Sequence, residues 1–166
     1  MINGEKFLRK QYPDLDEQQY QPAGIDLKLG KIETFDIDKK YYGIIDGVKI
    51  IPNRKELKMN ALSVDGKMKN VYSLQPNVPY IATVQNQVSI NENSLQFYTP
   101  RSSILRCGSN VMTAIGDPGF NGHLSFLVMN YLPVDFVITK GERFAQLVDI
   151  RVDGIMNKYD GDYNEK

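Results

Sequence analysis

The sequence has little of what disulfide frameworks and metal centres are made from. It contains one cysteine and one histidine, which excludes an intrachain disulfide and any cysteine-rich or histidine-rich metal site built by a single chain. The sequence also has no excess of charge of either sign, because 20 basic side chains balance 20 acidic ones. A general electrostatic attraction to nucleic acid is therefore not expected, and an anionic ligand would need a local basic cluster.

Long apolar runs are missing as well. No stretch is long and apolar enough to cross a bilayer, and residues 1–6 lack the apolar core of a secretory signal. We therefore expect a cytoplasmic protein whose partners include neither a membrane nor a nucleic acid. The length of 166 residues fits a single domain, with an N-terminal helix and linker over 1–20 and a flexible polar tail over 157–166.

What the sequence does contain is a succession of short apolar or alternating runs, separated by Gly, Pro, Asn and Asp. This pattern is typical of strands, and Asp46-Gly47 between two runs predicts a two-residue hairpin. The predicted strands are Ile25–Leu29, Tyr41–Ile45, Val48–Ile51, Val71–Leu74, Tyr80–Val84, Val88–Ile90, Leu124–Met129, Phe136–Ile138 and Phe144–Val152. A short helix capped by Asn3 precedes them, and the polar segment 53–70 is either an extended loop or an irregular hairpin. The sequence thus predicts an all-β barrel, sandwich or jelly roll.

The densest group of polar side chains consists of Arg101, Ser102, Ser103 and Arg106. A short helix beginning near Ser103, with Ser102 or Ser103 as its cap, would present amides, hydroxyls and arginines together, which is the chemistry of a phosphate site. The alternative is a capped helix whose arginines are only solvated. The spacing does not decide between these two interpretations.

Asp117-Pro118-Gly119 predicts a tight turn between two strands, and taken alone this structural interpretation is favoured. A carboxylate held in such a turn beside a basic cluster could also orient or deprotonate a water molecule. Phe120, just after the turn, either packs against a ligand ring or enters the core, which is the usual fate of a phenylalanine.

Asp26 and Gln146 are polar residues within otherwise apolar strands. Asp26 lies in an alternating run, so its side chain is expected to point away from the core, where it is either solvated or holds a metal-bound water. Gln146, if buried, needs hydrogen-bond partners from a ligand or from neighbouring backbone. Cys107 is expected to pack as a small buried residue, and His123 to lie at the surface or an interface.

Four segments, taken in their order along the chain, resemble the motifs of the trimeric deoxyuridine triphosphatase and deoxycytidine triphosphate deaminase superfamily. Residues 23–27 (AGIDL) resemble the first motif and residues 100–103 (PRSS) the second. Residues 116–122 (GDPGFNG) resemble the third, and residues 141–147 (GERFAQL) the fourth. The resemblance covers roughly residues 20–150. It implies a distorted jelly-roll or β-prism subunit of the β-clip type, assembled as a homotrimer with active sites between subunits.

The resemblance also implies roles for single residues. Asp117 would activate water, Asp26 would support Mg²⁺ through water, and Gln146 would contact the α-phosphate or the attacking water. Phe120 would lie under the deoxyribose, and Arg106 occupies a position where deaminases carry an arginine. The other substrate contacts would come from Arg101, Ser102 and Ser103 on the phosphates, and from the strand pair over about 111–115, with Thr113 and Ala114, on the pyrimidine.

Two branches of the superfamily compete for this chain. Three features resemble those of the deaminases: Arg106, the residue sequence of the third motif, and the tail over 159–163. Deaminases also need a glutamate in the strand after the third motif, and that position is Leu127, which cannot transfer a proton. The chain is therefore most similar to the short deaminase-like diphosphatases of archaea and some viruses.

Their reaction is the Mg²⁺-dependent hydrolysis of dUTP to dUMP and pyrophosphate, which limits uracil incorporation into DNA. The expected substrate is accordingly dUTP. The alternatives are a dCTP deaminase, alone or bifunctional, and a nucleotide-binding regulator without turnover. In the hydrolysis reaction the tail would close over the site, with Tyr163 stacking on the base or binding a phosphate, and the alternative is a plain frayed terminus.

Overall fold

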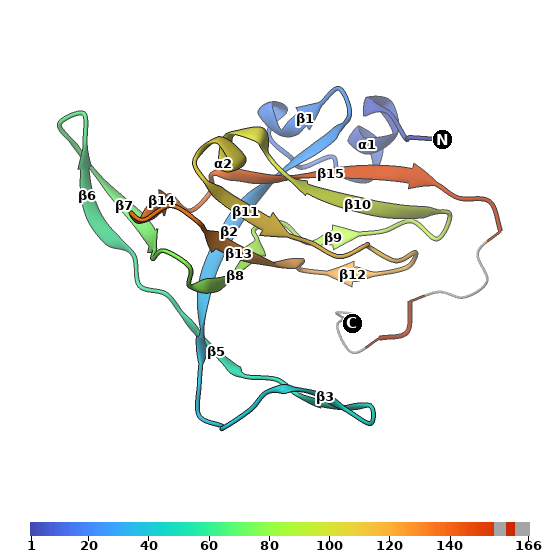
Figure 1. The fold of residues 1–166 in the computed structure, drawn as a ribbon. Coiled ribbons are helices and arrows are strands. Elements are labelled where there is room, and N and C mark those ends of the chain that lie inside the picture. Colours follow the sequence, from blue (N-terminus) through green and yellow to red (C-terminus); the bar gives the residue numbers. More distant parts are fainter. Residues whose placement is uncertain (155–158, 162–166) are drawn as a thin grey trace.

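The chain folds around one antiparallel sheet that curls into a nearly closed barrel (Figure 1). The computed structural model describes residues 1–154 and 159–161. The strands follow one another in the order β10-β15-β2-β8-β13-β11. Their bounds are Ser94–Pro100 for β10, Arg143–Arg151 for β15, Gly24–Asp36 for β2, Pro79–Val84 for β8, Ser125–Asn130 for β13 and Ser109–Met112 for β11. The expected all-β, jelly-roll-like fold is confirmed.

Shorter strands extend this sheet or stand beside it. Both β1 (Tyr20–Gln21) and β5 (Asn53–Glu56) pair with β2, and β9 (Val88–Ser89) pairs with β12 (Asn121–Gly122). A three-stranded sheet contains β14 (Phe136–Ile138), β7 (Lys67–Leu74) and β6 (Asn60–Val64), while β3 (Gly43–Ile45) pairs with β4 (Val48–Ile50). The long strand β2 therefore runs from the barrel out to the projecting hairpins (Figure 1).

The helices are short and lie at the edges of the barrel: α1 (Glu5–Gln11), the 3-10 turn η1 (Glu17–Gln19) and α2 (Ser102–Arg106). The prediction that Asn3 caps the first helix is wrong. Gly4 is the N-cap, and the Asn3 side chain instead donates to Oδ1 of Asp149 at 2.6 Å. A charged acceptor makes the stronger hydrogen bond, which outweighs the local capping preference. None of the described helices is long and apolar enough to span a bilayer.

Helix α2 also begins differently from the prediction. Its N-cap is Arg101, whose backbone is extended, and no side chain caps the helix. The prediction that Ser102 or Ser103 caps it is therefore wrong. Both serines lie inside the first turn of α2. The extended conformation that continues from β10 ends at Arg101, so the helix begins at Ser102, one residue before the predicted start at Ser103.

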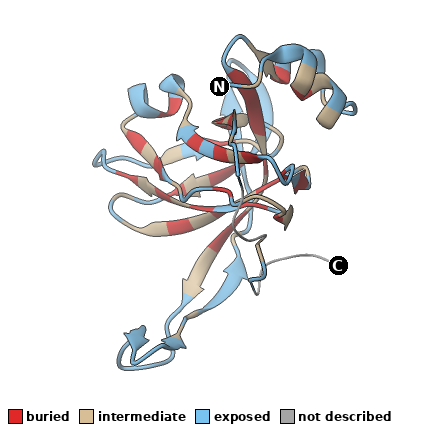
Figure 2. Ribbon diagram, turned by 90° about the vertical axis from the view of Figure 1, so that its right-hand side faces the viewer, coloured by how far each residue is buried: buried red, intermediate tan, exposed pale blue. Residues whose placement is uncertain are grey.

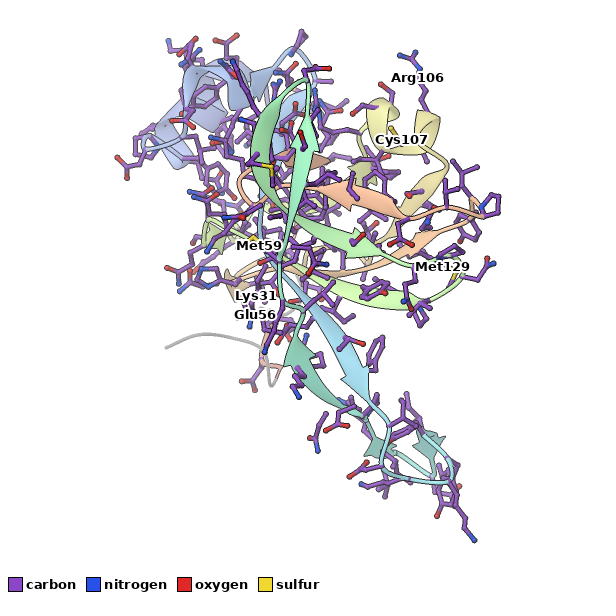
Figure 3. All side chains as sticks on the ribbon, turned by 90° about the vertical axis from the view of Figure 1, so that its left-hand side faces the viewer. Lys31, Glu56, Met59, Arg106, Cys107 and Met129 are labelled. Carbon is purple, nitrogen blue, oxygen red and sulfur yellow. The ribbon has the colours of Figure 1, made fainter. Side chains whose placement is uncertain are left out.

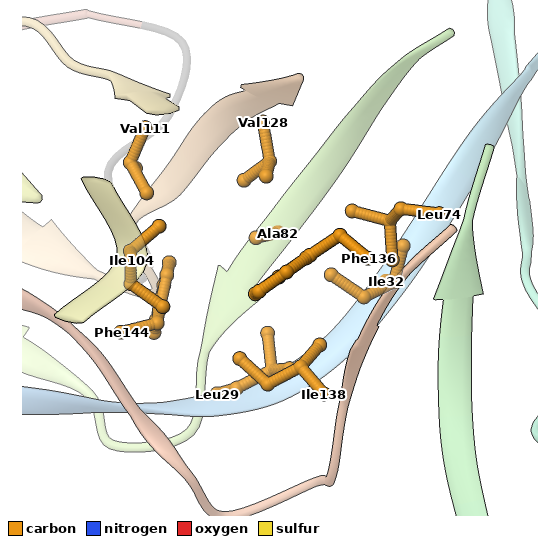
Figure 4. Close-up of a pocket in the computed structure, with 10 residues that line it drawn as sticks. All are labelled: Leu29, Ile32, Leu74, Ala82, Ile104, Val111, Val128, Phe136, Ile138 and Phe144. Atoms are coloured by element: carbon orange, nitrogen blue, oxygen red, sulfur yellow. The ribbon is translucent and has the colours of Figure 1, made fainter. Parts of the chain in front are cut away.

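Buried and more exposed positions alternate along the strands (Figure 2), and the buried positions carry mainly apolar side chains that fill the barrel. Along β8, for example, Tyr80, Ala82 and Val84 are buried, while the residues between them are half-buried. Figure 4 shows the middle of this core, where Ile104 of α2 faces a small space together with side chains from the surrounding strands. Helix α1 contributes Leu8. Because side chains fill the interior, ligand chemistry must lie at the edges and turns of the barrel.

Strand β10 is an element that the sequence did not predict. Its inward positions carry Ser94, Gln96 and Tyr98, which are all buried, where a typical strand has hydrocarbon side chains. Phe97, on the opposite face, is 46% exposed. Polar residues thus point inward and an aromatic residue points outward, which conceals the alternation that marks a half-buried strand.

Two hairpins project from the barrel, and one of them was predicted. Asp46 and Gly47 have φ of 48° and 81° and join β3 to β4, as expected for a two-residue turn. Asp65 and Gly66, with φ of 50° and 73°, form a second such turn between β6 and β7. The segment 53–70 is therefore largely a hairpin rather than a loop, and its strands escaped prediction because their side chains are exposed on both faces.

We refer to residues 37–52, which contain the β3–β4 hairpin, as the arm. The arm extends away from the barrel at the lower right of Figure 1 and is almost wholly exposed in Figure 2. It carries a set of large apolar side chains that are each more than half exposed: Ile37, Tyr41, Ile44, Ile45, Val48 and Ile51. Such a patch marks a surface that contacts another molecule.

Candidate active site

Strand β15 brings three of the four motifs together, because it lies between β2 and β10. Gln146 of β15 is directly opposite Asp26 of β2 on one side and Thr99 of β10 on the other. Directly opposed residues of antiparallel strands project from the same face of the sheet. The first, second and fourth motifs therefore meet at one edge of the barrel.

Asp26 lies at the centre of this edge, between two arginines. Nε of Arg101 is 2.8 Å from Oδ2 of Asp26, and Nη1 of Arg143 is 3.3 Å from the same oxygen. Asp26 points away from the apolar core, as predicted, but the alternative that it is solvated is wrong, since it is only 2% exposed. The alternation of β2 fails here because flanking elements cover both faces of the strand, one with core residues and the other with guanidinium groups.

The charge of Asp26 is set by two opposing effects. Burial raises the pKa of its carboxyl group, and the positive charges of Arg101 and Arg143 act to lower it. Arg143 is itself held in place, because its Nη1 donates to the carbonyl of Gln18 at 2.5 Å. Arg101 Nη1 in turn donates to the carbonyl of Arg143 at 3.3 Å. The result is a pair of cations on either side of one buried carboxyl group.

Helix α2 supplies the remaining phosphate-binding candidates. Ser102 and Ser103 are exposed on its first turn, directly after Arg101. Arg106 is exposed in the last turn and extends away from the barrel (Figure 3). Cys107 is also exposed, so the expectation that it is buried is wrong. It follows the last helical residue, and the buried side chain of this short helix is Ile104 instead.

The Asp117 segment forms the predicted turn. The amide of Phe120 donates to the carbonyl of Asp117 at 3.1 Å, and the Asp117 side chain is exposed. The turn is tied to Ile90, whose carbonyl accepts from Gly119 and whose amide donates to Phe120. Phe120 is 9% exposed, so its ring packs into the molecule. The carboxylate is thus accessible on a backbone that is hydrogen-bonded on both flanks.

Thr113 and Ala114 lie on the approach to this turn. The Thr113 hydroxyl donates to the carbonyl of Tyr98 at 2.8 Å, and Ala114 is exposed. The strand pair expected over 111–115 is shorter than predicted, because β11 ends at Met112. Residues 113–115 leave the sheet to reach the bridge between Gln96 and Gly116, so their backbone groups lie outside the β11–β13 ladder.

The described part of the C-terminal tail packs against the same turn. The amide of Tyr159 donates to the carbonyl of Pro118 at 2.9 Å. Its ring meets the Phe120 ring edge-on, with centroids 5.5 Å apart. Tyr163, the residue singled out from the sequence, lies outside the described residues. The tail residue found beside the turn is therefore Tyr159, which sequence reasoning noted only as part of a resemblance.

The structure separates the predicted site into two clusters. Gly116, which precedes Asp117, pairs with Gln96 of β10, whereas Arg101 follows the C-terminal end of that strand. Five Cα steps of extended chain lead from Gln96 to Arg101, which corresponds to roughly 16 Å. The Asp117 turn and the start of α2 are therefore attached at different points along β10.

Some residues of the two clusters were missed by sequence reasoning. Arg143 was quoted within the fourth motif without a role, although it contacts Asp26 directly. Gln96 and Asp149 are fully buried beneath the Asp117 turn. Each is a polar residue flanked by apolar ones in its strand, which is a signal the sequence does carry. Among the described residues, no group of three or more His, Cys, Asp or Glu side chains is arranged to hold a metal ion.

Comparison with known proteins identifies the family of the chain. The family model described as dCTP deaminase-like matches residues 4–152. A relative from Methanopyrus kandleri, named "Probable deoxyuridine 5'-triphosphate nucleotidohydrolase", is 39% identical over 98% of this chain and 99% of its own. A relative of the same name from Methanothermobacter thermautotrophicus is 36% identical over 99% and 100%.

The solved structures support the fold independently. The crystal structure of 2'-deoxycytidine 5'-triphosphate deaminase from Agrobacterium tumefaciens matches with a TM-score of 0.65 and 18% identity, over 92% of this chain and 48% of that one. At this identity the likeness concerns the fold alone. Together with the four motifs in order and the family model over most of the chain, it leads to one conclusion: this chain belongs to the dCTP deaminase-like family.

Proposed function

We propose that the protein hydrolyses dUTP to dUMP and pyrophosphate. The observation that carries the proposal is the exposed Asp117 carboxylate, presented on a turn whose backbone is hydrogen-bonded on both flanks. A carboxylate so held can orient a water molecule for attack on phosphorus. The names of the archaeal relatives support the same substrate. A cytoplasmic location is part of the proposal, on the sequence grounds given above.

The arginine cluster supplies the electrostatic half of the reaction. Arg101, with the hydroxyls of Ser102 and Ser103 beside it, is proposed to bind the triphosphate and to stabilise the charge that develops on the leaving pyrophosphate. Gln146, next to Asp26 in the sheet, is proposed to contact the α-phosphate or the attacking water. Arg143 keeps the Asp26 carboxylate neutralised while Arg101 turns toward the phosphates.

Mg²⁺ is proposed to bind as part of the nucleotide. This cation usually keeps several waters and binds through substrate phosphates with one or two carboxylates, and it would neutralise phosphate charge. The donor set fits that mode: the Asp117 carboxylate is exposed, and Asp26 lies beside the phosphate-binding arginines. Two arginine contacts on Oδ2 disfavour Asp26 as a direct ligand, so its proposed role remains a contact through water.

Leu127 supports hydrolysis over deamination. It lies on β13, half-buried, opposite Met112 and Ile81. β13 carries no carboxylate at any of its positions, so it offers no group to move a proton to or from a pyrimidine ring. Arg106 is the feature that keeps deamination as the second candidate, since it lies on α2 with the other phosphate-binding residues.

A homotrimer is proposed as the working assembly. The Asp117 turn and Arg101 are attached to β10 roughly 16 Å apart along the strand, and a site between subunits would bring the turn of one copy to the arginines of another. The exposed apolar side chains of the arm are a surface that assembly could bury. Closed rings of identical subunits form when a patch on one copy meets a different patch on the next.

The test is product analysis with the purified protein, Mg²⁺ and either dUTP or dCTP. Formation of dUMP and pyrophosphate from dUTP alone is the expected result, and the Asp117→Asn variant is expected to lose at least about 100-fold in kcat. Asp14→Asn, the same chemical change at an exposed position outside the site, serves as the control. Uracil nucleotides and ammonia from dCTP would establish a deaminase instead. Tight nucleotide binding without turnover would establish a regulator.

A further inference from the structure

A polar network lies directly beneath the Asp117 turn, inside the barrel wall. Its centre is Gln96 of β10, which is 0% exposed. Next to it is Asp149 of β15, which is also 0% exposed. Buried amides and carboxylates are costly unless every polar atom is hydrogen-bonded, so such a network is retained only when its geometry is satisfied.

The main chain of Gln96 holds the residue that precedes Asp117. Its amide donates to the carbonyl of Gly116 at 2.9 Å, and its carbonyl accepts from the amide of Gly116 at 2.8 Å. This pair is an isolated bridge and not part of a longer ladder. The position of Gly116, and with it the direction in which the chain enters the turn at Asp117, therefore depends on where the backbone of Gln96 lies.

The side chain of Gln96 is held by three hydrogen bonds. Its Oε1 accepts from the hydroxyl of Tyr98 at 2.9 Å. Its Nε2 donates to Oδ2 of Asp149 and to the hydroxyl of Tyr12, both at 2.9 Å. Asp149 is fixed in turn by Asn3, whose Nδ2 donates to Oδ1 at 2.6 Å. Both hydrogens of the Gln96 amide group are thus used, and its oxygen is oriented.

The ring of Tyr98 also packs directly against the backbone of Gly116, just before the turn. A side chain built at Gly116 would have its Cβ 2.3 Å from the Tyr98 hydroxyl and 2.6 Å from Cδ1 of Ile90. The backbone at Gly116 therefore lies as close to the ring as a glycine allows. Tyr98 is itself packed against Phe126, with ring centroids 5.2 Å apart. Any movement of the tyrosine is transmitted to the turn.

We propose that Gln96, together with Tyr98 and Asp149, is a positioning device for the carboxylate of Asp117. The network fixes Gly116 and so sets the direction in which the next residue presents its side chain. This inference rests on the proposed function, in which Asp117 orients the attacking water. None of the three residues touches the substrate. Their effect is on the alignment of the reacting atoms, where errors near 1 Å cost up to about 100-fold in rate.

The first test removes one hydroxyl from the network. Tyr98→Phe deletes the hydrogen bond to Gln96 but leaves the ring packed against Phe126. We expect kcat for dUTP hydrolysis to fall about tenfold, while KM stays within about twofold. The matched control is Tyr80→Phe. Tyr80 is also buried, and its hydroxyl accepts one hydrogen bond, from the amide of Gln75, but it lies on β8 opposite Thr34 and Val128.

A network that serves only stability would give a different pattern. Both tyrosine variants would then lower Tm by similar amounts and leave kcat of the folded enzyme unchanged, which would overturn the proposal. Binding of the non-hydrolysable analogue dUpNHpp, measured by calorimetry, separates the two cases further. Its Kd is expected to be the same for wild type and Tyr98→Phe, because alignment for attack and not nucleotide binding is lost.

The second test exchanges the partners of the buried pair. Gln96→Glu places a second carboxylate against Asp149 and is expected to lower kcat by tenfold or more. Asp149→Asn removes the charge from its original position. The double variant restores one carboxylate and one amide in contact, so kcat is expected to recover to within about threefold of wild type. Failure of the double variant to recover, when it folds with a wild-type Tm, would also overturn the proposal.

These outcomes remain distinct from a failure of the proposed function. If Asp117→Asn keeps full turnover, the role of Asp117 is wrong and the positioning proposal falls with it. If Asp117→Asn is inactive but Tyr98→Phe and Gln96→Glu match wild type in kcat, only the positioning proposal is wrong. The variants are therefore compared in one assay, with the wild-type enzyme and the Asp117→Asn variant as its limits.

Discussion

The environment of Asp26 in the structure differs from the environment that its sequence position predicts. In the sequence it is an acid in an alternating strand, for which solvation is the ordinary outcome. In the structure it is nearly inaccessible and shares one oxygen, Oδ2, between Arg101 and Arg143. A buried carboxylate with two cations tolerates the departure of one of them, whereas a carboxylate with one cation does not. This property makes Arg143 a natural support for an arginine that must turn toward phosphate.

The first prediction at this scale concerns Arg143→Met. With Arg143 removed, Arg101 is the sole counter-charge of Asp26 and is expected to stay with it, so KM for dUTP should rise about tenfold. The free energy of unfolding should fall by about 2 kcal/mol, less than for a fully buried pair, because the Arg143 side chain is 25% exposed. Steady-state kinetics and urea unfolding measure the two effects. Arg151→Met, on the same strand but exposed, is the control, and an equal rise in its KM would contradict the prediction.

The second prediction concerns alkaline pH. Burial raises the pKa of Tyr98 and that of Tyr12 far above the ordinary value of 10.0. Above that value the unfolded chain loses these two protons while the native state retains them, so the free energy of unfolding must fall as pH rises. Each tyrosine contributes a slope of about 1.4 kcal/mol per pH unit. Urea unfolding of wild type and Tyr98→Phe between pH 8 and 11 should show a shallower loss in the variant. Parallel curves would contradict the assignment.

At the scale of the element, β15 is the strand on which the site depends. It pairs with β2 on one side and β10 on the other, and so places the first, second and fourth motifs next to one another. The middle of β15 is crowded against the start of β2. A Cβ at Gly24, where β2 begins, would lie 1.8 Å from the backbone oxygen of Leu147. Glycine at this position is required by close backbone approach.

Gly24→Ala is therefore expected to disrupt the junction of β2 and β15. The clash is with backbone and cannot be relieved by rotating a side chain, so the free energy of unfolding should fall by about 3 kcal/mol. Activity should fall as well, because Asp26 lies two residues from Gly24 and Gln146 is adjacent to Leu147. Gly43→Ala is the control, since a Cβ there meets nothing within 4 Å. Thermal unfolding compares the two variants, and equal Tm values would show that the junction can relax.

At the scale of the whole molecule, the barrel is self-contained and the arm is not. Large apolar side chains of the arm remain exposed, although an apolar surface of this kind is stabilised by burial. The two halves of the candidate site are also apart. The proposed association of identical subunits would account for both features. It would cover the arm and bring the Asp117 turn of one copy to the arginines of another.

A change on the arm should therefore alter assembly and activity together. Ile44→Asp places a charge on a side chain that is 74% exposed, so the folded subunit should keep its Tm in isolation. We expect wild type to elute with three times the mass of the 18.9 kDa chain, and the variant to dissociate on dilution with a parallel loss of activity. Light scattering coupled to size exclusion measures this. Lys39→Asp, which also places an aspartate on the arm and changes the charge by two units instead of one without removing apolar surface, is the control, and dissociation of both variants alike would contradict the assignment.

The sequence by itself determined the strand-rich fold, the Asp46-Gly47 hairpin and the turn at Asp117, because these follow from local rules of alternation and turn chemistry. It also determined the family, through four motifs in order. It did not determine that β10 is a strand, because the inward positions of β10 are filled by Ser94, Gln96 and Tyr98 rather than hydrocarbons.

Only the tertiary structure decided which polar groups are buried and with what. Asn3 leaves its helix for the carboxylate of Asp149, Asp26 is enclosed by Arg101 and Arg143, and Cys107 stays at the surface. Local sequence carries no record of these partners, since the residues that satisfy a buried charge lie more than 70 positions away along the chain. Hydrogen bonds and ion pairs between distant strands outweigh local preferences of a few tenths to about 1 kcal/mol, and this is where the candidate site is built.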